Sequence, residues 1–336
     1  MKPNIAIVGG AGFVGKYLSK HLVRNFQVKI LDVQKPPEDL ENLVNYAYCD
    51  LRNFNELRDG LEDADLAIHT AIVQIPLINE KKSLGYDVNV VGTQNVCKAV
   101  EDSPRTKGLI LSGTWHTIGE RDISGTIDEE FGFRPDKVES RARLYALSKV
   151  VQESIVRYYD EMSAKIYGII RMGTVLGAGM PLETAASIFI KRAIRGESIT
   201  PFKHSMYRPM LYVDIRDVCK AYEAFALKIL KGNCAKNGTS LTHVVNVYYP
   251  EPMTILELAE TVKKLVADLT QGKKKARLEI VDKGVPLLFK KNDKNRIEVN
   301  ITKVQAFLGV RNPRSPKAAL RDIIKAQLKN RAKSQV

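Results

Sequence analysis

The sequence contains few residues of the kinds that bind metals or form disulfides. Its 336 residues include only four cysteines and five histidines, and none of them has a C-x2-C or similar ligand spacing. The cysteines are Cys49, Cys97, Cys219 and Cys234, and the histidines are His21, His69, His116, His204 and His243. We therefore expect reduced core thiols and no metal site.

Long apolar runs are also missing. No run approaches the roughly 18 apolar residues of a membrane-spanning helix, and the first residues lack the cleavage-site pattern of a signal peptide. With 44% hydrophobic and 27% charged residues, the chain can bury a substantial core. We expect a cytoplasmic protein without a membrane segment.

Negative charge is scarce in the last fifth of the chain. Residues 271–336 contain 18 of the 52 Lys and Arg residues but only 5 of the 38 Asp and Glu residues, and the whole chain has a net charge of +14. A basic surface that favours solubility is the simplest interpretation. Attraction of an anionic substrate and docking on nucleic acid are the alternatives. The lysine clusters lack interleaved aromatic residues, which argues against a nucleic-acid partner.

An apolar stretch near the N-terminus runs into three spaced glycines, Gly9, Gly12 and Gly15, and then into a helical pattern that begins at Phe13 and Val14. This order of strand, turn and helix predicts a dinucleotide-binding turn, in which phosphates meet the N-terminus of the helix. The glycines would permit, in order, a tight turn, the approach of a pyrophosphate and close packing of the helix on the sheet.

A second strand-like stretch ends in Asp32, about 20 residues after the glycines. A carboxylate at that place accepts hydrogen bonds from an adenosine ribose diol, which favours NAD over NADP. Lys35 is close enough to meet a 2′-phosphate instead. We expect NAD as the cofactor, with NADP as the alternative.

Tyr145 and Lys149 are four residues apart, and they share a face if the segment is helical. A free phenol has a pKa of about 10, and an ammonium nearby lowers that pKa, so Tyr145 could exchange a proton with a substrate hydroxyl or carbonyl. The same spacing arises by chance, as an interfacial Tyr beside a solvated Lys. The glycine turn and Asp32 favour the catalytic interpretation.

Strand-like and helical patterns alternate through the first half of the chain. The strands are expected near 4–9, 28–32, 44–48, 65–70, 107–112 and 165–171, and the helices near 13–24, 53–60, 83–102 and 142–162. This alternation predicts an α/β Rossmann domain with a doubly wound parallel sheet in residues 1–172. Residues 173–336, with helices near 182–195, 214–230 and 254–270, would mainly form a smaller substrate-binding lobe interleaved with the first. The basic stretch 272–295 would form a mobile or hairpin-like insertion.

With these elements placed, the chain resembles the extended short-chain dehydrogenase/reductase family, which includes nucleotide-sugar epimerases and dehydratases and the 3β-hydroxysteroid dehydrogenase-like enzymes. The resemblance covers about residues 4–325. Its ordered landmarks are Gly9-Gly-Ala-Gly12-Phe-Val-Gly15, Asp32, Asp50-Leu51, His69-Thr-Ala71, Asp87-Val-Asn89-Val-Val-Gly92-Thr93, Leu111-Ser-Gly-Thr114 and Tyr145 to Lys149.

For the cofactor, the resemblance implies that Asp50 and Leu51 flank the adenine, and that Ala71 lets the ribose and pyrophosphate pass. Asn89 would have a structural role, bonding backbone near the active site.

For catalysis, the resemblance implies that Thr114 orients the substrate oxygen, with Ser112 as the runner-up. Lys149 would bond the nicotinamide ribose and lower the pKa of Tyr145, which would accept a proton as hydride leaves the substrate carbon. We therefore take Tyr145, Lys149 and Thr114 as the catalytic residues.

Several later residues depart from the family pattern or match it loosely. Thr174 stands where nucleotide-sugar enzymes commonly carry an asparagine that helps to hold the diphosphate, which shifts some weight toward reductase-like relatives. Arg208 resembles an arginine that contacts phosphate, with a surface arginine as the alternative.

Trp115 and His116 replace the acidic pair of family dehydratases, which disfavours dehydration, and both could line the pocket. Glu129 belongs to an acidic cluster that we interpret as solvated.

These features together predict an NAD-dependent enzyme that acts on a secondary alcohol of a small, anionic substrate. A nucleotide-sugar epimerase-like activity is narrowly favoured. The alternatives are a dehydrogenase or reductase of the 3β-hydroxysteroid dehydrogenase-like type and, from another class, a non-catalytic dinucleotide-sensing protein. Family members often pair through the helices that match 83–102 and 142–162, so we expect a homodimer.

Overall fold

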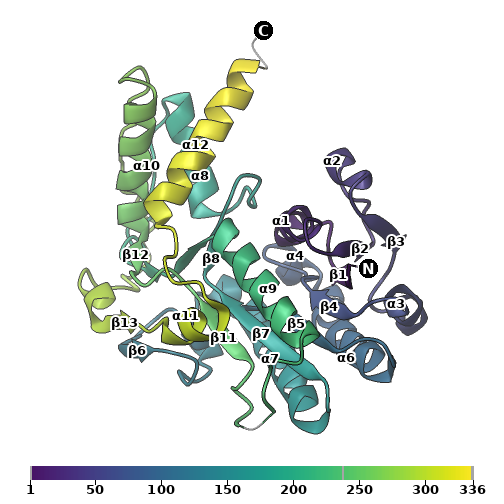
Figure 1. The fold of residues 1–336 in the computed structure, drawn as a ribbon. Coiled ribbons are helices and arrows are strands. Elements are labelled where there is room, and N and C mark those ends of the chain that lie inside the picture. Colours follow the sequence, from purple (N-terminus) through teal and green to yellow (C-terminus); the bar gives the residue numbers. More distant parts are fainter. Residues whose placement is uncertain (1, 237, 334–336) are drawn as a thin grey trace.

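A seven-stranded sheet with helices on both faces forms the centre of the molecule (Figure 1). The computed structural model describes residues 2–236 and 238–333, so residues 237 and 334–336 of the expected second lobe lie outside the described residues. The strands are β1 (Asn4–Val8), β2 (Gln27–Asp32), β3 (Asn45–Tyr48), β4 (Leu66–His69), β5 (Gly108–Thr114), β7 (Ile166–Met172) and β11 (Val244–Val247). They are all parallel and lie in the order β11-β7-β5-β4-β1-β2-β3. The predicted doubly wound parallel sheet is confirmed.

Apolar faces of six helices cover the sheet. On one face lie α1 (Phe13–Leu22), α9 (Ile215–Leu230) and α11 (Thr302–Leu308), whose buried residues, including Leu18 and Phe225, share one apolar core with β1 and β7. On the other face lie α3 (Phe54–Leu61), α6 (Gly92–Asp102) and α7 (Arg143–Met162), which bury Leu57 and Val156 in a second core. The expected helix near 83–102 consists of α5 (Lys82–Tyr86), one π-helical turn and α6.

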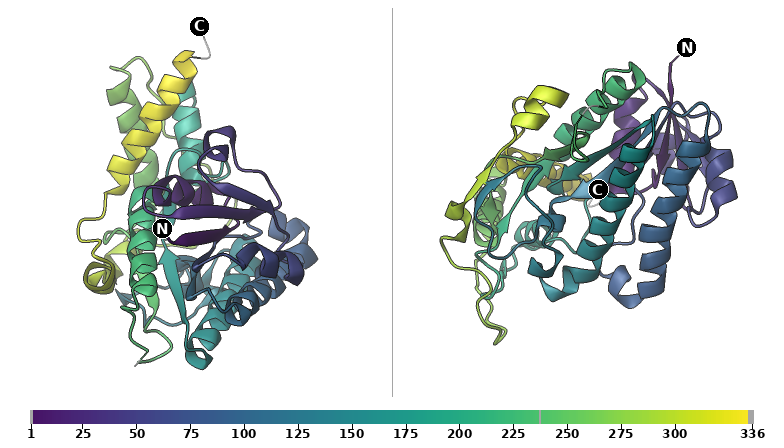
Figure 2. Two further views of the ribbon diagram at one scale, coloured as in Figure 1. Left: turned by 45° about the vertical axis from the view of Figure 1, so that its right-hand side comes forward. Right: turned by 90° about the horizontal axis from the view of Figure 1, so that it is seen from below.

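Three further helices project beyond the sheet as a separate packed group (Figures 1 and 2). They are α8 (Ala185–Arg195), α10 (Ile255–Leu269) and α12 (Pro316–Lys333). Their shared core includes Phe189, Leu258 and Leu320. α9 and β11 belong to the sheet layers although they follow residue 172. The division of the chain at residue 172 stays a prediction.

Three pairs of short strands lie outside the seven-stranded sheet. β8 (Thr174–Leu176) pairs with β10 (Tyr212–Asp214), β9 (Pro209–Met210) with β12 (Met253–Thr254), and β6 (Gly125–Ile127) with β13 (Ile297–Val299). Two short helices, α2 (Glu38–Glu41) and α4 (Leu77–Glu80), lie within the first half of the chain.

The stretch 272–295, all of which is described, does not form the expected hairpin. Its chain runs beside residues 199–204, with the amide of Ile199 donating to the carbonyl of Arg277 at 2.8 Å and the amide of Val281 donating to that of Pro201 at 3.0 Å. The backbone partners of this stretch come from a distant segment, which no local sequence pattern reveals.

The four cysteines are free thiols, and Cys49, Cys97 and Cys219 are buried. Burial raises the pKa of the Cys49 thiol to about 12, so this thiol is protonated near neutral pH. Across residues 2–236 and 238–333, no helix combines the length and the apolar character needed to cross a membrane.

Candidate active site

The glycine turn lies where the carboxyl ends of β1 and β4 diverge, at the point where the strand order reverses. Gly9 follows β1 with a φ of +82°, and a Cβ there would lie 2.3 Å from the amide nitrogen of Ala71. A Cβ at Gly15 would lie 2.6 Å from the Cα of Gly10. Both contacts involve backbone, so only glycine fits at these two positions. Open α/β sheets bind their ligands in the crevice at such a reversal.

The residues of this crevice fit a dinucleotide. Gly12 is the N-cap of α1 and places no side chain over the helix N-terminus, which leaves it accessible to phosphate. The Asp32 carboxylate accepts hydrogen bonds from the amides of Ala11 and Gln34, both at 2.9 Å. These bonds orient Asp32 beside the turn, where a ribose diol is expected. Lys35 is exposed.

Phe13 and Val14 form the start of α1, and both are partly buried. Phe13 packs against the core of the three projecting helices and Val14 against the core shared by α1 and α9, so their side chains anchor the helix. Their contact with a cofactor stays a prediction.

The residues expected around the adenine follow β3. Arg52 binds both oxygens of the Asp50 carboxylate, with Nε at 2.9 and 3.0 Å, and lowers the pKa of Asp50. Leu51 is buried and packs against Gly92, where a Cβ would lie 2.0 Å from a Leu51 methyl group. Contact of Asp50 and Leu51 with adenine stays a prediction, and Arg52 is a competing partner for the carboxylate.

The three predicted catalytic residues come together at the carboxyl end of β5. Thr114 ends this strand, and its side chain hydrogen-bonds the half-buried Tyr145 in the first turn of α7. One turn further along α7, the buried Lys149 donates from Nζ to the carbonyl of Ser112 at 2.8 Å. A helix and a neighbouring strand thus supply a phenol, a hydroxyl and an amine to one place.

The pKa of Tyr145 shifts in the direction opposite to the one expected, and the pKa of Lys149 shifts as well. Burial raises the pKa of Tyr145 to about 12, against the opposing hydrogen bond from Thr114. Burial also lowers the pKa of Lys149 to about 7, although Glu153 raises it. The expected lowering of the tyrosine pKa by Lys149 is therefore not observed, because desolvation dominates both groups. In this state Tyr145 is a proton donor near neutral pH.

The lowered lysine pKa predicts a pH dependence of stability. In the unfolded chain Lys149 has an ordinary pKa of about 10.4, so between pH 7 and that value the unfolded chain binds more protons than the folded one. The free energy of unfolding should therefore rise with pH in this window, by up to about 1.4 kcal/mol per pH unit. Urea unfolding of wild type and Lys149→Met from pH 6 to 10 measures this, and the variant should lose most of the rise. An identical pH dependence in both proteins would contradict a buried lysine that titrates near neutrality.

A histidine and a carboxylate extend the site beyond Thr114. Residues 115–118 form a 3-10 turn, in which His116 Nδ1 lies 3.1 Å from Thr114 Oγ1 and Nε2 lies 3.4 Å from Glu120 Oε1. The His116 ring meets the Tyr145 ring edge-on at 87° with centroids 5.7 Å apart. Sequence reasoning named His116 only as a lining residue and missed Glu120, although the two are four residues apart.

Glu120 is buried with its charge compensated. Burial alone would raise its pKa, but Arg208, His116 and the amide of Glu139 outweigh that effect and lower the pKa to about 2. Arg208 Nη1 lies 3.6 Å from Glu120 Oε2 and 2.7 Å from Glu139 Oε1. Arg208 is itself only 7% exposed, so the alternative of a surface arginine is wrong. Its contact with a substrate phosphate stays a prediction, since two carboxylates already face it.

Trp115 and Thr174 contact each other. The Trp115 side chain is fully buried, and its indole N–H donates to Thr174 Oγ1 at 3.1 Å. The Thr174 hydroxyl, at the position of the family asparagine, therefore holds the Trp115 ring in place. Direct contact of Thr174 or Trp115 with substrate stays a prediction.

Three other polar residues have structural partners. Asn89 Oδ1 accepts from the amide of Val73 at 2.7 Å, which agrees with its expected backbone-bonding role. The Ser112 hydroxyl contacts the Tyr222 hydroxyl at 2.6 Å, away from Tyr145. The interpretation of Glu129 as solvated is wrong, because it is 9% exposed and accepts from the amide of Asn246 at 2.7 Å.

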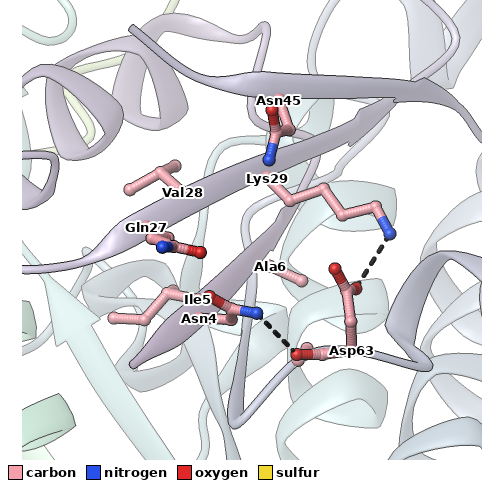
Figure 3. A pocket seen from close by; sticks show the side chains of 9 residues that line it. Asn4, Ile5, Ala6, Gln27, Val28, Lys29, Asn45 and Asp63 are labelled. Atoms are coloured by element: carbon pink, nitrogen blue, oxygen red, sulfur yellow. Dashed lines mark hydrogen bonds and ion pairs between the residues drawn. The ribbon is translucent and has the colours of Figure 1, made fainter. Parts of the chain in front are cut away.

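A shallow hollow lies at the opposite edge of the sheet, near the amino ends of β1 and β2 (Figure 3). Asn4 donates there to the carbonyl of Asp63 at 3.0 Å, and Lys29 pairs with the Asp63 carboxylate at 2.9 Å. Because none of the predicted site residues lines it, this hollow is not the candidate active site.

Comparison with known proteins identifies the family. The model of the NAD dependent epimerase/dehydratase family matches residues 5–236, which is more than half of the chain. This match confirms the resemblance inferred from the ordered landmarks, and it confirms NAD as the cofactor on which the family depends.

Curated relatives have different activities. The chain is 28% identical over 158 residues to the 3 beta-hydroxysteroid dehydrogenase/Delta 5→4-isomerase of vaccinia virus (strain Ankara), a match that covers 45% of this chain and 44% of the viral protein. It thus spans less than half of that relative. It is 26% identical over 278 residues to UDP-glucuronic acid decarboxylase 3 of Arabidopsis thaliana, covering 79% of this chain and 75% of the relative.

Among solved structures, the UDP-glucose 4-epimerase of Thermus thermophilus in complex with NAD superposes with a TM-score of 0.75. The superposition covers 96% of this chain and 99% of that chain, at 20% sequence identity. At this identity the likeness shows the fold.

Proposed function

The chain belongs to the NAD dependent epimerase/dehydratase family. From this premise we propose that it oxidises a secondary alcohol, with the hydride leaving for the nicotinamide and the hydroxyl proton going to Tyr145. The observation that carries the proposal is the hydrogen-bonded pair of Tyr145 and Thr114 at the carboxyl end of β5, with Lys149 beside it. NAD, when bound, would supply the hydride acceptor. Its nucleotide half would lie on the glycine turn, with Asp32 at the adenosine ribose.

The chain's own residues orient the substrate and move its proton. Tyr145 and Thr114 share the substrate oxygen, which places the alcohol carbon toward the crevice above β1 and β4. Lys149, with a pKa of about 7, can bond the nicotinamide ribose and adjust its charge at little cost near neutral pH. Thr114 and Lys149 are buried, and their burial would limit the access of water to the proton path.

A nucleotide-sugar epimerase-like reaction is the activity we favour. Such an enzyme oxidises the sugar, lets the keto intermediate turn, and returns the hydride to its other face. The basic C-terminal fifth would attract an anionic substrate of this kind, and the likeness to the Thermus thermophilus epimerase spans nearly the full chain.

A dehydrogenase or reductase of the 3β-hydroxysteroid dehydrogenase-like type is the second candidate, and two observations favour it. Arg208, the expected phosphate contact, faces Glu120 and Glu139. Thr174, at the position of the expected diphosphate-binding asparagine, accepts from Trp115. Both features leave fewer free groups to bind a diphosphate. The second also places the Trp115 ring close to Thr114.

One experiment separates the candidates. Small molecules released from denatured protein are identified by mass spectrometry, and the protein is then incubated with a panel of UDP-sugars or with hydroxysteroids and added NAD. An epimerase retains NAD and forms an isomeric sugar without net cofactor reduction. A dehydrogenase accumulates reduced cofactor in step with ketone. Bound NAD with no conversion of either class would contradict both and support a dinucleotide-sensing protein.

We also propose that the chain forms a homodimer through α7. One stripe of this helix exposes apolar side chains at helical spacing, namely Leu144, Leu147, Val151, Tyr158 and Met162. Exposed apolar stripes of this length commonly mark protein interfaces. α6 packs beside α7 and can extend the surface.

The dimer proposal predicts that Leu147→Glu with Val151→Glu halves the mass measured by light scattering after size exclusion. Two buried charges without partners would oppose association. Leu182→Glu is the control, because Leu182 is a large exposed apolar residue outside α7. A wild-type mass equal to that of one chain, 37.6 kDa, would contradict the proposal.

A further inference from the structure

A loop within the basic stretch 272–295 exposes apolar side chains next to lysines. This loop, residues 283–287, runs between two contacts with the segment 202–204. The apolar side chains at this place are Phe202, Val285 and Leu287, which are 43–58% exposed. Large apolar side chains that gather on a surface commonly mark a site of contact with a partner.

The path of the chain keeps these three side chains together. At the start of the loop, Lys283 Nζ lies 5.6 Å from the centroid of the Phe202 ring. At its end, the amide of Leu288 donates to the carbonyl of His204 at 2.9 Å, and the His204 ring stacks on the Phe202 ring with centroids 5.6 Å apart. The other two apolar residues are within two positions of these contacts, a span of at most about 7 Å of extended chain.

Hydrogen bonds and an ion pair fix the start of the loop. The Asp282 carboxylate accepts from the amide of Gly284 at 2.9 Å and pairs with Lys203 Nζ at 2.8 Å. Gly284 has a φ of +68°, which lets the chain turn there without a steric penalty. Phe289, which is 2% exposed, anchors the other end. The exposure of the apolar side chains therefore belongs to a loop that is held at both ends.

Three lysines of this segment have no acidic partner. Lys283, Lys290 and Lys291 form no ion pair within residues 2–236 and 238–333. The one acidic residue of 280–291 is Asp282, and Lys203 neutralises it. Unpaired ammonium groups beside exposed apolar side chains match a surface that is anionic at its outer layer and apolar beneath it.

We propose that the loop patch, which consists of Phe202, Val285, Leu287 and these three lysines, docks on a bilayer surface that contains anionic lipid. The apolar side chains enter the boundary between headgroups and acyl chains, and the lysines meet the anionic headgroups. The net charge of +14 adds attraction at longer range. The contact is peripheral, and it does not depend on the reaction proposed for Tyr145.

Two other kinds of partner fit the loop patch less well. A stable protein interface takes about 20–30 residues from each side, whereas the loop patch offers three apolar side chains. Single-stranded nucleic acid stacks its bases on open aromatic faces, but the Phe202 ring already stacks on His204 at an interplanar angle of 13°. On an anionic bilayer a few inserted side chains suffice, because apolar burial and charge attraction add.

Sedimentation with lipid vesicles measures the docking without substrate or cofactor. The wild type should bind vesicles of equal parts phosphatidylcholine and phosphatidylserine, and added salt should weaken this binding. Val285→Ser with Leu287→Ser should weaken it at least about tenfold, because fewer methylene groups are buried in the bilayer. Lys290→Gln with Lys291→Gln should weaken it about 25-fold, or about fivefold for each lysine.

Each double variant has a matched control. Ile280 is 50% exposed, but it precedes Val281, which pairs in register with Phe202. Successive side chains of an extended chain point to opposite sides, so Ile280→Ser should bind vesicles as the wild type does. Lys81→Gln with Lys82→Gln removes an exposed lysine pair at the start of α5 and should likewise have no effect.

A tryptophan probe reports insertion directly and keeps the loop patch apolar. The chain has a single tryptophan, Trp115, which is buried. Leu287→Trp should still bind the anionic vesicles, and its emission should shift to shorter wavelength when they are added. Ile280→Trp should show no such shift.

A wild type that does not sediment with the anionic vesicles would overturn the proposal, and so would equal losses in the loop-patch variants and their controls. Retention on duplex nucleic acid without vesicle binding would assign the lysines to that partner instead. All of these measurements read binding and none reads turnover, so their failure would leave the oxidation proposed for Tyr145 untouched.

Discussion

Replacing Tyr145 by phenylalanine should lower kcat by about 1,000-fold or more, because the variant lacks the hydroxyl that interacts with Thr114 and that we propose to bond the substrate oxygen. General acid–base groups commonly contribute about 100- to 10,000-fold, and Tyr145 also orients the substrate. The phenyl ring keeps its edge-on packing with His116. NAD affinity, measured by calorimetry, should therefore stay within about threefold of wild type.

Tyr158→Phe is the matched control for this prediction. Tyr158 lies on the same helix, α7, but is 69% exposed, so its hydroxyl is not expected to contribute to turnover. A Tyr145→Phe enzyme with near-normal kcat would show that another group carries the proton, and the assignment of Tyr145 would then be wrong.

Replacing Gly9 by alanine should both destabilise the protein and abolish measurable NAD binding. The φ of +82° costs a side chain about 1–2 kcal/mol, and the new Cβ would meet the Ala71 backbone at 2.3 Å. Relief of that contact requires β1 and β4 to separate at the point where the phosphates are expected. We expect several kcal/mol lower stability by urea unfolding and at least about 100-fold weaker NAD binding.

The variant Gly196→Ala separates the effect of the positive φ from the effect of the close contact with Ala71. Gly196 has a similar φ of +78°, but no atom lies within 4 Å of the place that a Cβ would take there. This variant should lose about 1 kcal/mol of stability and bind NAD normally. Equal losses of NAD binding in both variants would contradict a specific role for the close contact of Gly9 with Ala71.

The sequence allowed the sheet and the centre of the site to be predicted because both depend on local patterns. Gly15 is required by backbone contacts within one turn, Gly9 has a positive φ in that turn, and Tyr145 and Lys149 share a helix face. The six predicted strands, all in the central sheet, were placed within about two residues, since each is a short apolar stretch bounded by a helical pattern, whereas the short strand β6 was missed.

What could not be predicted depends on contacts between distant segments. Glu120 and Arg208 are 88 residues apart in the numbering and meet only in the folded chain. The buried state of Glu129 depends on the backbone of β11. The long helix α12 was missed for another reason: its apolar residues, such as Leu320 and Ile324, have helical spacing, but the basic composition of the segment drew attention to charge.

The pKa values required the structure as well. Helical spacing places an ammonium near Tyr145 and so predicts a lowered tyrosine pKa. Burial acts on both groups and reverses that expectation, raising the tyrosine pKa to about 12 and lowering the lysine pKa to about 7. The extent of desolvation is a property of the packed site, which pairwise spacing does not contain.

Rapid mixing of the NAD-loaded protein with substrate, followed by the near-ultraviolet absorbance of reduced nicotinamide, tests the central claim most directly. The wild type should show this absorbance within one turnover, transiently for an epimerase and lastingly for a dehydrogenase, and Tyr145→Phe should show almost none. Product formation without any reduced nicotinamide would contradict hydride transfer, and equal absorbance changes in the two proteins would contradict the role of Tyr145 in it.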